Sequence, residues 1–170
     1  MKKLLLFFVL TLSLTLSAQK ASEIKIDVFD ILALKTLDVS FERVMNSESS
    51  VGVALLFNFE KKSSSFRYSE EFVLSPYYRQ HLFYKGNVNF FGELFGALNT
   101  GDIDLTPAEI AVDKADTYTD FALGLGFGGK YVSSHGFVVD FHAGIGRNLF
   151  NTEVSREIVP RVGISVGKSF

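Results

Sequence analysis

The sequence predicts an all-β fold, an eight-stranded antiparallel up-and-down barrel. Three observations lead to this fold class. Apolar and polar residues alternate along eight segments, as in strands with one apolar face. Short turns alternate with long polar loops between those segments, and glycines gather on the polar face. The length of 170 residues fits a single domain.

Residues 1–18 have the features of a secretory signal peptide. They begin with two lysines, continue through an apolar run at 4–16 and end in two small residues. The apolar run is shorter than the roughly 20 residues that a transmembrane helix requires. We therefore expect cleavage after Ala18, which leaves residues 19–170 as the barrel domain.

Composition and charge exclude several classes of protein. The chain has no cysteine, which excludes a disulfide scaffold and a zinc ribbon. Its net charge is −2, and removal of residues 1–18 takes away two lysines and no acidic residue, leaving −4. Nucleic-acid binding requires an electropositive surface, so no nucleic-acid partner is expected. No cofactor is expected either.

The first strand has the weakest pattern. Ile24, Ile26 and Val28 alternate with polar residues, but the period slips at 29–31. A bulge or a short turn is expected around 34–36.

The other seven strands alternate more clearly, although Phe91 and Phe95 interrupt one of them. Their apolar stripes are Leu37, Val39 and Phe41; Val51, Val53, Leu55, Phe57 and Phe59; Phe72, Leu74, Tyr78 and Leu82; Val88, Phe90, Leu94 and Leu98; Phe121, Leu123, Leu125, Phe127 and Tyr131; Phe137, Val139, Phe141, Ala143 and Ile145; and Val162, Ile164, Val166 and Phe170.

The connections alternate in length along the chain. Segments 46–50, 85–87 and 134–136 are tight, whereas three others, at 61–69, 100–117 and 150–158, are long and polar. Segments 85–87 and 134–136 suit three-residue hairpins with Asn87 and Gly136 in the left-handed conformation. This alternation is typical of an outer-membrane barrel with short periplasmic turns and longer extracellular loops.

The glycines indicate which face is inside. A water-bathed polar face has no need of glycine, whereas the lumen of an eight-stranded barrel is barely wide enough for side chains. The sequence therefore favours a transmembrane barrel with a polar lumen over a soluble, lipocalin-like ligand binder. The glycines on the polar face are Gly124, Gly126, Gly128, Gly144, Gly146, Gly163 and Gly167.

With its leader and eight amphipathic segments, the chain resembles small outer-membrane barrels of the OmpA/OmpX type. The last strand, 159–170, carries much of this resemblance because it ends in Phe170. The Ser-Ala-Gln leader ending and segments 41–43 and 77–79 are similar to small barrels of Bacteroidota. The resemblance implies a porin-like protein in a Gram-negative outer membrane, whose last strand is the signal for the barrel assembly machinery. The signal residues would be Val162, Ile164, Val166 and Phe170; Lys168 departs from the aromatic residue often found there.

Charged residues on the polar face are expected to fill the lumen. The hairpin turns place Arg79 opposite Glu93 and Lys130 opposite Asp140, so opposite charges meet twice. We interpret the lumen as a polar plug, and a gated path for small ions is the alternative. The predicted lumenal charge network is Glu42, Arg79, Glu93, Lys130, Asp140, His142 and Arg161.

Catalysis and metal binding are not expected. If the last hairpin places His142 opposite Ser165, then Ser165, His142 and Asp140 meet, but an enclosed lumen offers no substrate access. The chain is therefore not predicted to be an enzyme. His81 is expected in the lumen and His135 in a turn, neither as a metal ligand.

Loop 100–117 is long and acidic. Thr106 and Glu109 form a capping box around Pro107, which predicts a short helix over 107–112. The loop offers a surface for an extracellular partner, and Gly101-Asp102-Ile103-Asp104 is a fragment of a calcium-binding pattern. A plain solvated loop is the alternative.

The expected function is a structural or surface-interaction role in the cell envelope. The expected partners are outer-membrane lipid, the barrel assembly machinery and an extracellular partner at loop 100–117. A narrow transport or lipid-handling barrel is one alternative, and a soluble periplasmic ligand binder is another.

Overall fold

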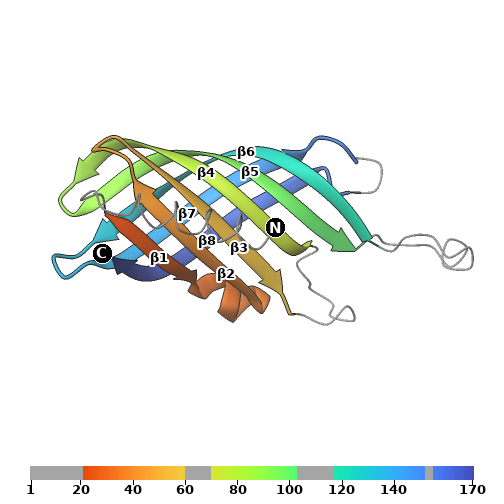
Figure 1. The fold of residues 1–170 in the computed structure, drawn as a ribbon, viewed down its shortest axis with the longest axis horizontal. Coiled ribbons are helices and arrows are strands. Elements are labelled where there is room, and N and C mark those ends of the chain that lie inside the picture. Colours follow the sequence, from red (N-terminus) through yellow and green to blue (C-terminus); the bar gives the residue numbers. More distant parts are fainter. Residues whose placement is uncertain (1–20, 60–69, 103–116, 152–154) are drawn as a thin grey trace, which may run out of the picture.

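The computed structural model describes residues 21–59, 70–102, 117–151 and 155–170. They form a closed antiparallel barrel in which each strand pairs with its neighbours in chain order and β8 pairs with β1 (Figure 1). The predicted all-β fold with eight strands is confirmed. The elements are β1 (Ser22–Asp27), η1 (Asp30–Leu34), β2 (Thr36–Val44), β3 (Ser49–Asn58), β4 (Glu70–Lys85), β5 (Val88–Asp102), β6 (Thr117–Val132), β7 (Phe137–Asn148) and β8 (Ile158–Ser169).

The two faces of each strand follow the predicted alternation. On β6, Leu125 and Phe127 are each 67% exposed, whereas Ala122 and Gly124 between the apolar positions are buried. Phe91 and Phe95, which interrupt the alternation of β5, are buried and face the lumen. The outer surface is therefore apolar, whereas the interior holds buried charged and polar side chains together with an apolar cluster that includes Leu56, Val73 and Phe95.

The short turns gather at one end of the barrel, which we call the turn end (Figure 1). Gly136 has φ 77°, as the predicted three-residue hairpin requires. The hairpin of β4 and β5 has only two turn residues, and Gly86 rather than Asn87 has a positive φ, 61°. A register shift between His81 and Phe83 absorbs the difference. For this reason Arg79 still lies opposite Glu93.

The irregular segment after β1 is a π-helix, η1, and not the predicted bulge or short turn. Asp27 ends the strand because its Oδ1 accepts hydrogen bonds from the N–H groups of Phe29 and Asp30, at 2.9 and 3.1 Å. Lys35 ends η1 with a left-handed φ of 54°. The helical turn takes up residues that would otherwise have lengthened β1.

Across the residues that the structure describes, no helix has the length and hydrophobicity to span a membrane. The predicted leader (1–18), the loop segment 61–69 and the predicted helix at 107–112 lie outside the described residues.

Candidate functional site

The lumen near the turn end contains a network of buried charges. Alternate residues of each strand point inward, so the network draws on β1, β2, β4, β5, β6, β7 and β8. All seven predicted residues line the lumen. Six of them are buried, and Arg161 is half-buried. They are Glu42, Arg79, Glu93, Lys130, Asp140, His142 and Arg161.

Glu42 on β2 is the centre of this network and has no exposed surface. Its Oε2 accepts hydrogen bonds from Lys25 Nζ at 2.6 Å and from Arg79 Nη1 at 2.9 Å. Its Oε1 accepts from the Ser50 hydroxyl at 2.6 Å and from Lys130 Nζ. One carboxylate therefore joins three cations from three other strands.

Arg79 on β4 reaches across the lumen. Its Nε donates to Glu93 on β5 at 2.7 Å, and its Nη1 donates to Glu42 and to Asp140 on β7. The guanidinium also lies over the ring of Phe91, 4.0 Å from the centroid. A planar group with five donors suits this position because it bonds several carboxylates at once.

The predicted register of Lys130 is confirmed, but the predicted ion pair of Lys130 with Asp140 is wrong. Lys130 lies opposite Asp140 in the β6–β7 ladder, as predicted. Its ammonium nevertheless contacts Glu23 at 2.8 Å and Glu42 on the far wall. Asp140 pairs instead with Arg79 and with Lys25 at 2.7 Å. Long side chains in a narrow lumen reach across it and need not pair with their ladder neighbours.

Two members of the network, Glu23 and Lys25, were not predicted from the sequence. Both are buried on β1 and share the inward face with Asp27. Their alternation with Ile24 and Ile26 indicates the inward face. It was not used because the strand is short and the alternation breaks at 29–31.

Glycines leave room for the aromatic rings of β5. A Cβ at Gly124 would collide with the ring of Phe95, and one at Gly128 would lie 2.5 Å from the Phe91 ring. Real Cβ atoms do not approach so closely, and backbone atoms of β7 also lie within 3 Å of both positions, so movement of the rings alone would not make room for a side chain. The crowded lumen expected from the sequence is therefore present.

The Ser-His-Asp trio does not assemble. The β7–β8 ladder places His142 opposite Gly163 and Ser165 opposite Asp140, two residues away from the expected register. The Ser165 hydroxyl donates to Asp27 Oδ2 at 2.9 Å. His142 Nδ1 lies 3.6 Å from Asp140 Oδ1, whereas the Ser165 hydroxyl is bonded to Asp27.

The other two histidines lie at the turn end. His81 is half-exposed, with Nδ1 3.2 Å from the Ser47 carbonyl oxygen, and His135 is an exposed turn residue. Within the described ranges, no cluster of three or more His, Cys, Asp or Glu side chains is placed to hold a metal ion.

Comparison with known proteins supports the fold. The family described as "Protein of unknown function (DUF3575)" matches residues 4–156. No curated protein matches the chain. The crystal structure of Neisserial surface protein A (NspA) is similar with a TM-score of 0.56 and 12% identity, over 89% of this chain and 94% of that one. The crystal structure of Ail, the attachment invasion locus protein of Yersinia pestis, gives a TM-score of 0.48 and 11% identity, over 89% of this chain and 97% of that one.

Proposed function

The chain belongs to the DUF3575 family, which assigns no activity, and from its barrel we propose an integral outer-membrane protein with a sealed polar lumen. Its role is structural or one of surface interaction in a Gram-negative envelope, and the sequence resemblance points to Bacteroidota. It is not an enzyme. Residues 1–18 are the cleaved leader, and loop 100–117 faces the exterior, where it meets an extracellular partner.

One observation carries this proposal, the inside-out distribution of side chains. Among the described residues, exposed large apolar side chains outnumber buried ones, while charged groups such as Glu42, Arg79 and Asp140 are fully or almost fully buried. A water-soluble barrel would expose this apolar surface at a cost of about 25 cal/mol per Å². A lipid bilayer removes the cost.

Aromatic side chains at the turn end support the membrane position. Tyr78, Tyr84 and Tyr131 are exposed there, and the rings of Phe83 and Phe90 stack at 4.7 Å. Such rings gather where the hydrocarbon meets the headgroups. The turn end would then lie at the periplasmic interface.

Fractionation combined with electrophoresis tests the proposal. We expect the protein in the outer-membrane fraction, and we expect its mobility to change when the sample is boiled, because a closed barrel resists detergent until it is heated. A soluble periplasmic protein without a mobility shift would overturn the proposal and favour a soluble ligand-binding barrel.

The last strand is the proposed signal for the barrel assembly machinery, through Val162, Ile164, Val166 and Phe170. Phe170 also closes the barrel, because its N–H donates to the Ser22 carbonyl at 2.9 Å and its carbonyl accepts from the Ser22 N–H at 3.0 Å. The Phe170 side chain is exposed and thus open to recognition.

Phe170→Ala is expected to reduce the amount of heat-shifting protein in the outer membrane, with unfolded chain accumulating in the periplasm. The backbone bonds to Ser22 survive this change, so the loss would report recognition of the side chain. Phe150→Ala, which removes another exposed ring outside the last strand, is the control. Equal yields of the two variants would contradict the assigned signal.

A further inference from the structure

Between β8 and β2, the barrel wall changes from a paired strand to a helical turn. The β1–β8 ladder ends at Asp27 and Ser165, although β8 extends back to Ile158. Beyond Asp27, η1 takes the place of a strand. The Asp27 carboxylate fixes this change, since it bonds η1 and also accepts from the Ile164 N–H at 3.2 Å.

Two features mark this stretch of wall as specialised. Pro160 lies in it, and proline has no N–H to donate, so within sheets it is found at strand edges. Single π-turns are rare and occur often at functional sites. The wall here is a helical turn against a strand edge and has no continuous ladder.

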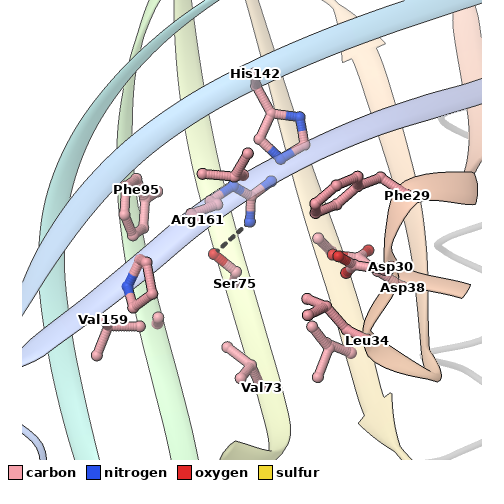
Figure 2. Close-up of a pocket in the computed structure, with 15 residues that line it drawn as sticks. Phe29, Asp30, Leu34, Asp38, Val73, Ser75, Phe95, His142, Val159 and Arg161 are labelled. Carbon is pink, nitrogen blue, oxygen red and sulfur yellow. Dashed lines mark hydrogen bonds between the residues drawn. The ribbon is translucent and has the colours of Figure 1, made fainter. Parts of the chain in front are cut away.

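A cavity of about 240 Å³ lies behind this stretch of wall. Figure 2 shows its labelled side chains, with Phe29 and Leu34 of the η1 region on one side and Val159 and Phe95 on the other. Most of the lining is apolar. The further apolar residues are Ala54, Leu56, Val73, Ala97, Pro160 and Val162.

The lining residues of β8 show where the cavity opens. Val159 and Arg161 face the lumen, whereas Pro160 and Val162 face outward, and all four line the cavity. The cavity therefore continues around the edge of β8 to the outer surface. Beside it, η1 exposes Leu32 to 84%, so the opening is flanked by apolar surface.

We propose that this cavity binds one hydrocarbon chain of a membrane amphiphile, which enters from the bilayer between β8 and η1. The inference rests on the proposed membrane location, which places the opening against hydrocarbon. The cavity exceeds the roughly 150 Å³ that accommodates benzene in an apolar protein interior. It is smaller than the roughly 300 Å³ at which pockets for whole drug-sized ligands begin, so it has room for one chain but not for a whole amphiphile.

The polar groups of the cavity keep the headgroup outside. Arg161 donates from Nη1 to Ser75 at 2.9 Å (Figure 2). Its Nε lies 3.0 Å from Glu93, which balances its charge. Asp30 and Asp38 add carboxyl groups on the side of η1 and β2. His142 of β7 also lines the cavity. Because Glu93 already balances the charge of Arg161, the guanidinium is not free to bind an anionic headgroup, whereas a hydrocarbon chain needs no cation.

Photo-crosslinking in vesicles tests the proposal. The wild-type barrel is placed in phosphatidylcholine vesicles that contain phosphatidylcholine with a diazirine at the end of one acyl chain. After irradiation, adducts are located by mass spectrometry. We expect adducts on the outward residues Leu125 and Phe127, and also on Val73, which faces the lumen.

Ala97→Leu is the test variant because Ala97 lines the cavity and is buried. We expect its adducts on Val73 to fall about tenfold, since added methylene groups exclude the chain, while adducts on Leu125 persist. Ala143→Leu adds the same volume on the outer face of β7 and should change neither the adducts on Val73 nor those on Leu125. The heat-dependent mobility shift verifies that both variants are folded.

The outcomes separate this inference from the proposed function. Adducts on Leu125 and Phe127 but none on Val73 would overturn the chain-binding cavity and leave the membrane barrel intact. Adducts on neither face would overturn both. Equal labelling of Val73 in wild type and in Ala97→Leu would show that the bound chain does not occupy this cavity. If Ala97→Leu does not fold, the presence or absence of Val73 adducts in the wild-type barrel decides the question.

Discussion

Glu42→Gln is expected to lower the free energy of unfolding by about 3–5 kcal/mol, because it leaves buried cations without their shared anion. The substitution keeps the size of the side chain and removes only its charge. Glu42 bonds Lys25, Arg79 and Lys130, all of them buried. Asp140, Glu93 and Glu23 offer partial compensation, but none of them contacts all three cations in the described structure.

The measurement is urea unfolding in detergent, followed by the mobility shift on electrophoresis, since the chain has no tryptophan to report by fluorescence. Glu157→Gln is the matched control. It breaks an ion pair with Arg147 of similar length, 2.8 Å, in which the two side chains are 62% and 70% exposed. That loss should stay below about 1 kcal/mol. Equal losses in the two variants would show that the Glu42 cluster does not stabilise the barrel.

The strands were predictable because the outer face of the barrel wall is apolar, whereas the inner face carries polar residues and glycines. Leu125 and Phe127 on one face and Gly124 and Gly126 on the other follow from alternation alone. The register of β6 and β7 was predicted correctly because their turn is short, and few residues leave few ways to pair: Lys130 lies opposite Asp140. Arg79 lies opposite Glu93 as predicted only because the register shift between His81 and Phe83 compensates for a turn one residue shorter than expected.

The register of β7 and β8 was wrong by two residues because a long loop joins them. Such a loop sets no pairing sum, so the placement of Ser165 opposite His142 had no physical constraint behind it. The structure places Ser165 opposite Asp140. A shift of two residues preserves the inward face, and therefore the fold prediction survived the error.

Contacts across the lumen and the η1 turn were beyond the sequence pattern. Alternation assigns residues to a face but does not say which opposite wall a lysine reaches, as Lys130 and Glu42 show. The end of β1 depends on one carboxylate, Asp27, that bonds backbone groups of both η1 and β8. The slipped period indicated an irregularity there without giving its form.

Arg79→Ala is expected to turn a silent barrel into one that carries cations. The Arg79 side chain is buried and bridges Glu42, Glu93 and Asp140 across the lumen. Its removal leaves a gap that water can enter and frees carboxylates to face that gap. Rings of acidic side chains favour cations. Planar-bilayer recordings should therefore show no steps for wild type and small cation-selective steps for Arg79→Ala.

Arg147→Ala serves as the control for this experiment because it removes an arginine from an exposed ion pair outside the lumen. It should remain as silent as wild type. A folded Arg79→Ala barrel that carries no current would mean that Lys25, Lys130 and the rings of Phe91 and Phe95 close the lumen without the guanidinium. Steps that favour anions would show that the remaining lysines, and not the freed carboxylates, dominate the field in the gap. The absence of current would change the role of Arg79 from a seal to a support for neighbouring side chains, whereas anion-selective steps would keep Arg79 as a seal and contradict the predicted cation selectivity.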